Sequence, residues 1–456
     1  MCPGHMPLSQ NITHMDLSRL VAVAVLLVAL RPLRCHAAGD AKSLHPVVLV
    51  PGYAANQLEA QLTSAYEPPT PVCGARKGNG WFRLWPINHT AMDDPHEVAC
   101  FTDQMSLVYD AVAEDYGNAA GVVTRVPFFA STRGLIGWEQ VVRQLEAVGY
   151  RDGETLFGAP YDFRYSVAPP GHPSVEGARY LAALAGLIES ASSLNEGRPV
   201  VLVPHSLGCA LAYQFLLGRP LAWRRRFVER VVFVAAALGG FADGMNELAA
   251  GMDFGLPNLA RPSRTRLARS QQSALWRLPT PMVFGDRPLV VAKNRTYTAH
   301  DIVEFLQAIG FAEGVRPYLT RVLPMWEALP APMVPVTSII GVGVSTPDTF
   351  RYGEDGFIGS PEVVYGDGDG DINMVSLVAV EKEWSGVEGQ VLKVVRLPGV
   401  HHTEFFSDGF ALKEVVAEIR EAGRPANLWP KIGVQIDTHP GCEEEMNTAE
   451  GLQCFE

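Results

Sequence analysis

The stretch Val203-Pro204-His205-Ser206-Leu207-Gly208 joins a strand to a helix through a sharp turn. Residues 199–203 before the turn are an unbroken apolar run, typical of a buried parallel strand. Residues 209–217 after it are apolar over the length of a short helix. A serine in such a turn stands clear of the end of the sheet with an exposed hydroxyl. We therefore predict that Ser206 is a nucleophile.

This pattern is the nucleophile elbow, written G-x-S-x-G, with one departure. Pro204 occupies the position of the first glycine. Proline is compact but lacks an N–H, so it is tolerated where a strand leaves its hydrogen-bonded ladder. The elbow also directs the backbone N–H of Leu207 toward a substrate oxygen, which makes Leu207 a predicted oxyanion donor. The alternative is that Ser206 is an ordinary helix N-cap.

Other apolar runs predict more strands and helices. We predict strands over residues 46–51, 230–237, 335–344 and 391–397. We predict helices over residues 138–148, 174–193 (with Ser174 as N-cap) and 411–422. Short apolar strands that alternate with helices predict an α/β fold, with a mostly parallel sheet and helices on both faces.

Two segments do not follow this alternation. Residues 61–130 are rich in proline, glycine and aromatic residues, and we predict an irregular subdomain there. Residues 238–334 are too many for a crossover between neighbouring strands, so we predict an inserted cap.

A nucleophilic serine needs a histidine base and a carboxylate that orients it. In α/β-hydrolases the chain order is serine, acid, histidine. Asp367, Asp369 and Asp371 lie on one loop, and His401 and His402 follow a predicted strand. The order is right, but it leaves open which aspartate and which histidine act. The aspartates do not match an EF-hand, which needs a glycine and a glutamate further on, so we expect no metal or other cofactor.

The second oxyanion donor should come from the loop after the first strand. Gly52 in that loop allows a close backbone approach, and the N–H of Tyr53 is the predicted donor. The alternative is a plain strand-to-helix turn.

The composition excludes several classes of protein. The chain has 456 residues, 47% hydrophobic and 19% charged, so it can bury a large core and is not a disordered chain. Its net charge of −12 argues against nucleic acid as a partner. A mean hydropathy of +0.07 argues against a polytopic membrane protein.

The first 38 residues are organised like a secretory signal peptide. Leu20–Leu30 is an apolar run too short to span a bilayer, and Ala37 and Ala38 supply the small residues of a cleavage site. Arginines after the run leave a signal anchor as the alternative. We therefore predict a secreted, extracellular, vacuolar or lysosomal protein, with a signal over 1–38, a catalytic domain over 39–437 and an acidic tail over 438–456.

Entry into the secretory pathway has consequences for asparagine and cysteine. Asn88 and Asn294 each begin an Asn-x-Thr triplet and would be glycosylation acceptors. An oxidising compartment permits disulfides, and local pairing predicts Cys73–Cys100 and Cys442–Cys454. Cys209 is then left over, and we predict that it is a small buried hydrophobic residue.

Together these strings resemble the lecithin:cholesterol acyltransferase family, which includes a lysosomal phospholipase, plant members and phospholipid:diacylglycerol acyltransferases. The resemblance rests on residues 50–60, 159–164, 205–209, 367–370 and 397–404. These strings occur in the order of the family over about residues 45–425.

The resemblance implies a role for each site residue. Ser206 matches the nucleophile, Asp369 the acid and His402 the base. Tyr53 and Leu207 match the two oxyanion positions.

The resemblance also implies contact with lipid. The Cys73–Cys100 disulfide would close a small membrane-binding loop, and Trp81 and Trp85 inside it would lie at a lipid interface. Residues 61–130 would then be a lipid-interface subdomain. Within the cap, the residues after Gly240 match a mobile lid.

The implied activity is that of a serine-dependent O-acyltransferase or phospholipase. It would take an acyl chain from a phospholipid to a lipid hydroxyl or to water, in peripheral contact with a membrane. Two departures, Pro204 and Asp371, motivate the alternative of a non-catalytic lipid-binding relative. Asp371 replaces a threonine of the family and would raise the pKa of His402. A soluble peptidase or carboxylesterase is a further alternative.

Overall fold

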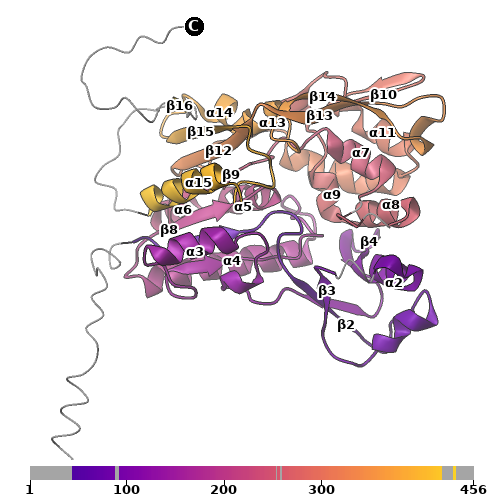
Figure 1. The fold of residues 1–456 in the computed structure, drawn as a ribbon, viewed down its shortest axis with the longest axis horizontal. Helices are drawn as coiled ribbons and strands as arrows, with labels where there is room; N and C mark the ends of the chain where they lie inside the picture. The colour runs from indigo at the N-terminus through magenta and orange to yellow at the C-terminus, as the bar shows by residue number, and fades with distance from the viewer. Residues whose placement is uncertain (1–43, 88–91, 253, 257–258, 424–434, 438–456) are drawn as a thin grey trace, which may run out of the picture. The chain divides into compact units, whose positions relative to one another are not determined.

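The computed structural model describes residues 44–87, 92–252, 254–256, 259–423 and 435–437 (Figure 1). The predicted signal, Asn88, the Cys442–Cys454 pair and the acidic tail lie outside the described residues.

A seven-stranded sheet forms the centre of the fold, in the order β16-β15-β12-β9-β8-β1-β7 (Figure 1). Every neighbouring pair in it is parallel. The strands are β1 (Val47–Val50), β7 (Leu156–Gly158), β8 (Val200–Pro204), β9 (Val228–Val234), β12 (Val336–Val342), β15 (Leu392–Pro398) and β16 (Gln435–Asp437). The predicted α/β class is confirmed: this is an α/β-hydrolase fold. The sequence analysis missed β7 and β16, which are too short to show a pattern.

Both faces of the sheet are covered, which explains why its strands are apolar throughout. Val48 and Val50 of β1 face the core cluster that includes α4 (Val175–Leu194) and α5 (Leu207–Leu217). The alternate residues Val47 and Leu49 face α3 (Glu139–Ala147) and α15 (Gly409–Ala422). All four β1 side chains are fully buried.

The predicted helices are present, with small differences at their ends. The helix after the elbow begins at Leu207, directly after Ser206. Ser174 lies at the N-cap position of α4, but its hydroxyl donates to the carbonyl of Ser166 at 3.2 Å and makes no cap hydrogen bond. The predicted N-cap position of Ser174 is therefore confirmed, although its side chain does not make the capping hydrogen bond.

The segment 61–130 is more ordered than predicted. It contributes two small antiparallel sheets, with orders β3-β2-β6 and β4-β5. Its elements are β2 (Leu58–Leu62), η2 (Pro71–Arg76), β3 (Phe82–Trp85), α2 (Pro95–Met105), β4 (Leu107–Asp110), β5 (Asp115–Asn118) and β6 (Val122–Arg125). These strands were missed because each has only four or five residues, and only β2 alternates strictly between apolar and polar residues.

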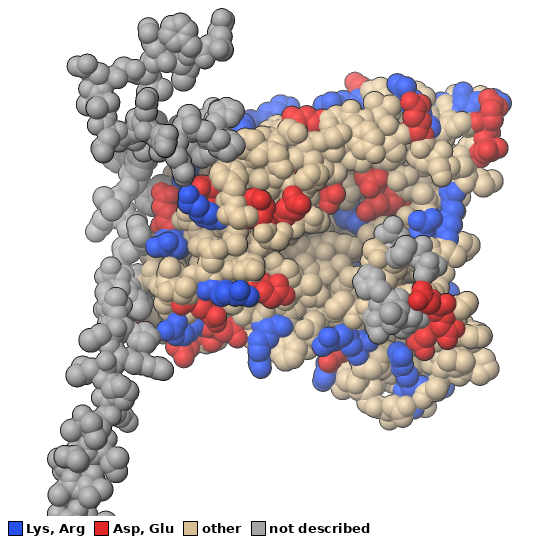
Figure 2. All heavy atoms as spheres, in the orientation of Figure 1, with Lys and Arg blue, Asp and Glu red and all other residues tan. Residues whose placement is uncertain are grey.

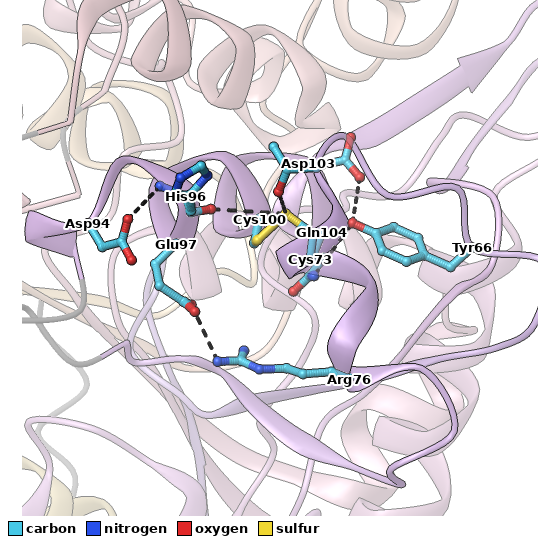
Figure 3. The surroundings of a disulfide bond; sticks show 10 residues. Tyr66, Cys73, Arg76, Asp94, His96, Glu97, Cys100, Asp103 and Gln104 are labelled. Carbon is cyan, nitrogen blue, oxygen red and sulfur yellow. Dashed lines mark hydrogen bonds and ion pairs between the residues drawn. A yellow bond between two sulfur atoms is a disulfide. The ribbon is translucent and has the colours of Figure 1, made fainter.

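A disulfide between Cys73 and Cys100 joins η2 to α2, as predicted (Figure 3). Tyr66 donates to the carboxylate of Asp103 at 2.9 Å beside it. These contacts reinforce a segment whose buried apolar residues, such as Leu84 and Phe101, belong to the main core cluster.

The segment 238–334 is mainly helical. Its elements are α7 (Asp243–Ala250), α8 (Arg261–Ser270), α9 (Gln272–Trp276), α10 (Pro281–Phe284), β10 (Val290–Ala292), β11 (Arg295–Tyr297), η5 (Ala299–Asp301), α11 (Ile302–Ala308), η6 (Ala312–Gly314), α12 (Val315–Pro317), η7 (Tyr318–Val322) and η8 (Leu323–Met325). Its two strands complete a four-stranded sheet, β11-β10-β13-β14, with β13 (Val344–Arg351) and β14 (Glu362–Gly368). This sheet therefore crosses the boundary at 334.

The other short elements are η4 (Thr132–Gly134), α6 (Leu221–Phe227), η9 (Gly356–Ile358), α13 (Met374–Leu377) and α14 (Ala379–Trp384). Within the described ranges, no helix combines the length and the apolar character that a membrane span requires.

A glycine substitution tests how closely α5 approaches β1. A Cβ at Gly208 would lie 2.4 Å from the carbonyl oxygen of Pro51, so Gly208→Ala must displace backbone. We expect a loss of about 1–3 kcal/mol in the free energy of unfolding. The control is Gly186→Ala on α4, where an added Cβ meets nothing within 4 Å. It should gain up to about 1 kcal/mol from helix propensity. Equal effects of both changes in denaturant unfolding would contradict the close approach.

Candidate active site

Ser206 has the backbone strain expected of a nucleophile elbow. Its φ is +53° and its ψ is −123°, a conformation that residues with a side chain rarely adopt. Two glycines that lie close to Ser206 in space leave room for this backbone conformation. A Cβ at Gly52 would lie 3.1 Å from the Cβ of Ser206, and Gly208 packs on Pro51. Strand and helix therefore approach closely around this serine.

Pro204 lies where the ladder between β8 and β9 is interrupted: the register of this pair ends at Leu202 and resumes at the bridge between His205 and Val234. This proline is the last residue of β8 and lies opposite Val50 of β1. The next hydrogen bond in that direction comes from the N–H of His205 to the carbonyl of Val50 at 3.0 Å. The missing N–H of proline therefore falls at the end of the strand, as the sequence analysis required. Cys209, one turn into α5, is a fully buried free thiol, as predicted.

Three side chains from distant parts of the chain form one hydrogen-bonded series. The Nε2 of His402 lies 2.8 Å from the Oγ of Ser206, and its Nδ1 lies 2.8 Å from the Oδ2 of Asp369. Because a carboxylate only accepts, Nδ1 carries the proton and Nε2 accepts from the serine hydroxyl. Asp369 and His402 are buried, which orients the imidazole and keeps water from competing.

Asp369 and His402 are buried, whereas the nearby aspartates and the neighbouring histidine are exposed. Asp369 also accepts the N–H of Ile372 at 2.7 Å, which fixes its carboxylate. Asp367 is exposed and accepts the N–H of Gly343. Asp371 is exposed at the cavity that contains Ser206.

His401 is exposed, whereas the side chain of its neighbour His402 is buried beside Ser206. Adjacent residues on this loop therefore point in different directions. The tertiary structure therefore distinguishes two histidines that local sequence pattern left equivalent, and the one beside Ser206 is the one that the family resemblance selected.

Two backbone N–H groups at the serine are free to receive a substrate oxygen. Leu207 is the first residue of α5, so its N–H has no acceptor within the helix. Tyr53 lies in the turn after β1. Among the hydrogen bonds of the described residues, neither N–H donates to another protein atom. Both residues line the same cavity as Ser206, where the sequence analysis predicted the oxyanion donors.

The cavity has a volume of about 440 Å³ and is lined largely by apolar side chains. Ile136, Ala210, Phe241, Met252 and Trp276 contribute apolar surface. The face of the molecule drawn in Figure 2 is hollowed near its middle. A cavity of this size and character accommodates an extended apolar group beside the serine.

One wall of the cavity is polar, and the sequence analysis missed it. Arg277 forms an ion pair with Glu247 of α7 at 2.9 Å, and its guanidinium lies 4.4 Å from the ring of Tyr53. The hydroxyl of Tyr53 donates to Gln271 at 2.5 Å. Asp243, one turn before Glu247, lines the same wall. Apart from Tyr53, none of these residues belongs to a motif, so no signal in the sequence pointed to Arg277, Glu247, Asp243 or Gln271.

The acidic members of this wall lie close enough to influence one another. Burial raises the pKa of Glu247 to about 7, Arg277 opposes this, and Asp243 and Asp371 raise it further. Burial also raises the pKa of Asp243, and Asp371 adds to that rise. The wall therefore gains negative charge as the pH rises through neutrality.

The two histidines next to the serine have opposite pKa shifts. Burial lowers the pKa of His402, but the carboxylate of Asp369 and, less strongly, that of Asp371 more than offset it, so the net pKa is raised. Burial, together with a smaller electrostatic effect of His402, lowers the pKa of His205 to about 3. His205 is therefore neutral and packs its ring 4.9 Å from that of Phe406.

The two tryptophans predicted at a lipid interface have different surroundings. Trp81 is 37% exposed and faces outward. Trp85 packs against Phe163 and Phe254, and its indole N–H donates to the carbonyl of Ala54 at 2.7 Å. Trp85 therefore supports the turn that carries Tyr53, and its contacts do not favour an outward role.

The described ranges contain no group of three or more histidine, cysteine or acidic side chains placed to hold a metal ion. Asn294 is exposed in the turn between β10 and β11.

The sheet and the strand-turn-helix at Ser206 define an α/β-hydrolase. A model of the lecithin:cholesterol acyltransferase family matches residues 81–322. Lecithin-cholesterol acyltransferase-like 1 of Oryza sativa subsp. japonica is 68% identical over 409 residues, covering 90% of this chain and 93% of that protein. The protein with the same description from Arabidopsis thaliana is 41% identical over 419 residues, covering 88% of this chain and 94% of its own.

A more distant relative is the lysosomal phospholipase A and acyltransferase of Homo sapiens. It is 34% identical over 384 residues, covering 80% of this chain and 88% of its own. The chain belongs to the lecithin:cholesterol acyltransferase family, as the resemblance predicted.

The charge of Asp371 should raise the lower pH limit of activity, with a smaller effect than that of Asp369. A histidine base works in its neutral form, so activity falls as the pH drops through the pKa of His402. Because Asp371 raises that pKa, Asp371→Asn should move the acid limb of kcat/KM to lower pH. The measurement is hydrolysis of a water-soluble p-nitrophenyl ester across the pH range.

Asp367→Asn is the matched control, because Asp367 lies on the same loop but faces Gly343 and does not line the cavity. It should leave the acid limb in place. An acid limb that stays in place or moves to higher pH in Asp371→Asn would show that the carboxylate does not act on His402.

Proposed function

We propose that this chain is a serine-dependent O-acyltransferase or phospholipase that acts on the acyl esters of phospholipids. The observation that carries the proposal is the hydrogen-bonded series Ser206–His402–Asp369 at the wall of a largely apolar cavity. Membership of a family whose relatives are named as acyltransferases and phospholipases supports the same class of substrate.

In the proposed mechanism, the Oγ of Ser206 attacks the ester carbonyl carbon while the Nε2 of His402 takes the hydroxyl proton. The carbonyl oxygen becomes an oxyanion that accepts hydrogen bonds from the N–H groups of Tyr53 and Leu207. Asp369 stabilises the imidazolium that forms. The intermediate then expels the lysophospholipid oxygen, which takes the proton from His402, and an acyl-serine remains.

The second half of the reaction releases the acyl chain. A hydroxyl of a lipid alcohol, or a water molecule, loses its proton to His402 and attacks the acyl-serine carbonyl. Collapse of the second intermediate returns the proton to Ser206. Exclusion of water from the cavity favours transfer over hydrolysis, and the apolar lining supports such exclusion.

The setting of the reaction is part of the proposal. The predicted signal over 1–38 would direct the chain into the secretory pathway, where Asn88 and Asn294 would be glycosylated. Residues 61–130, closed by the disulfide, would serve as the lipid-interface subdomain. Residues 238–334 would serve as the cap and lid, since α7 and Arg277 line the cavity.

A non-catalytic lipid-binding relative is the second candidate. The observation that favours it is Asp371, an added carboxylate at the cavity that raises the pKa of the proposed base. Such a protein would keep the cavity but would not form an acyl-serine.

A fluorophosphonate probe tests for a reactive serine. The wild-type chain should be labelled, and Ser206→Ala should not be labelled, because the Oγ is the attacking atom. Ser193→Ala, at an exposed serine of α4, is the control and should be labelled like wild type. Absence of labelling of the wild type from acid to neutral pH would favour the non-catalytic candidate.

The adjacent histidines provide a second matched pair. His402→Ala should lower kcat for ester hydrolysis on the order of 10⁴-fold, because it removes the base. His401→Ala should have little effect, since that side chain is exposed. Comparable losses in both variants would contradict the assignment of the base.

A product assay identifies the acceptor. Phospholipid labelled in its acyl chain should yield an acylated alcohol when a sterol or diacylglycerol is present, together with lysophospholipid. Free fatty acid as the sole product would restrict the function to that of a phospholipase.

A further inference from the structure

Two phenylalanines project from the turn between β6 and η4. Phe128 is 41% exposed and Phe129 is 37% exposed, although each is a large apolar side chain. Both residues lie at the end of the predicted lipid-interface subdomain 61–130, outside the disulfide loop 73–100 that contains Trp81 and Trp85. Adjacent exposed aromatic rings on a turn need an explanation, because they lose free energy in water.

The backbone of this turn is strained at its apolar residue. Phe128 has a φ of +62°, and Ala130 has a φ of +68°. A bulky residue in the left-handed region is an outlier, since glycine or asparagine adopts it more readily. Such strain persists where the surrounding structure enforces it, and it often marks functional sites.

The surrounding structure does enforce it. The N–H of Ala130 donates to the carbonyl of Gly158 at 2.9 Å, which ties the turn to the edge strand β7. The hydroxyl of Ser131 and the N–H of Thr132 both donate to Asp152 at 2.7 Å. The turn therefore presents Phe128 to solvent from a fixed backbone.

Arg125, which lines one pocket with Phe129, connects these rings to further exposed groups. Val123 on β6 is 42% exposed, and the guanidinium of Arg125 lies 4.3 Å from the ring of Trp81. The guanidinium of Arg133 lies 5.1 Å from the ring of Phe128. We call this group the aromatic surface, and it consists of Trp81, Val123, Arg125, Phe128, Phe129 and Arg133.

Among the described residues, the aromatic surface carries one positive charge that no ion pair offsets. Arg125 pairs with Glu59 at 2.7 Å, whereas Arg133 is in none of the ion pairs found among the described residues. Exposed aromatic rings beside arginines suit a phospholipid surface, because the rings enter the interface and guanidinium groups bind phosphate.

The turn is also connected to the cavity. In the segment that follows the turn, the N–H of Ile136 donates to the carbonyl of Ala55 at 2.9 Å. The carbonyl of Gly134 accepts from the N–H of Gln57 at 3.1 Å. Ile136 itself lines the cavity that contains Ser206. A lipid surface at the aromatic surface would therefore contact an element that forms part of the cavity wall.

We propose that the turn carrying Phe128 and Phe129 is a membrane-docking element, which inserts its rings into a phospholipid surface next to the cavity. This inference deepens the proposed function, because it names the surface that brings lipid to the site. In this proposal, the positive φ of Phe128 presents the ring to the membrane and does not stabilise the fold.

Vesicle sedimentation with equal parts of phosphatidylcholine and phosphatidylglycerol tests the proposal. All variants are made in the full chain carrying Ser206→Ala, so that turnover cannot alter the vesicles. Phe128→Asn should lower the partition coefficient on the order of tenfold, because a ring is removed from the interface. Its melting temperature should stay equal or rise, since asparagine tolerates a positive φ.

Two further variants sharpen the result. Phe129→Ser removes the second ring at a residue without positive φ and should also weaken binding, which keeps the test valid if Phe128→Asn folds poorly. Leu194→Asn is the control, because Leu194 is an exposed apolar residue (68%) at the end of α4, away from the aromatic surface. It should bind vesicles like the parent chain.

Several outcomes would overturn the proposal. Unchanged vesicle binding in both phenylalanine variants would do so, as would an equal loss in Leu194→Asn. A change in oligomeric state without a change in vesicle binding would identify the aromatic surface as a contact between copies of the chain.

The docking element and the proposed function can fail separately. Vesicle binding that depends on Phe128, in a chain that no fluorophosphonate labels, would preserve the docking element and reject the enzyme. Fluorophosphonate labelling together with vesicle binding that does not change in Phe128→Asn would preserve the enzyme and reject the docking element. With both intact, Phe128→Asn in the otherwise wild-type chain should lower activity on vesicles but not on a soluble ester.

Discussion

The close approach of α5 to β1 is the constraint on which the site depends. Gly208 packs against the backbone of Pro51, and Gly52 packs against Ser206, so no side chain separates the helix from the strand. This contact forces the positive φ of Ser206 and directs its hydroxyl toward His402. The burial of β1 on both faces anchors the contact, because the strand cannot move away without opening the core.

The same constraint organises the surroundings of the serine. The turn after β1 brings Tyr53 to the cavity, and three further segments hold that turn. Trp85 donates to Ala54, Ile136 donates to Ala55, and the hydroxyl of Tyr53 reaches Gln271. Three parts of the chain thus contact the turn beside Ser206: the disulfide-closed segment, the segment that follows the turn of Phe128 and Phe129, and the cap. Any of them can influence the site through this short piece of backbone.

Electrostatics distinguish this cavity from a purely apolar one. Asp243 and Glu247 line one wall with Arg277, and Asp371 adds negative charge near His402. Burial keeps Glu247 partly protonated near neutral pH, so the charge of the wall depends on conditions. The departure at Pro204 has no comparable effect, because it falls where β8 ends.

The sequence alone determined the α/β class, five strands of the central sheet and the choice of Ser206 as the predicted nucleophile. It could do so because buried parallel strands and the elbow are local patterns. It narrowed the acid to a loop and the base to two adjacent histidines, and family resemblance selected Asp369 and His402. Only the tertiary structure decided the polar wall of Arg277 and Glu247, the inward position of Trp85 and the exposure of Phe128. These features depend on contacts between residues far apart in the chain, and such contacts leave no periodic or local signal in a single sequence.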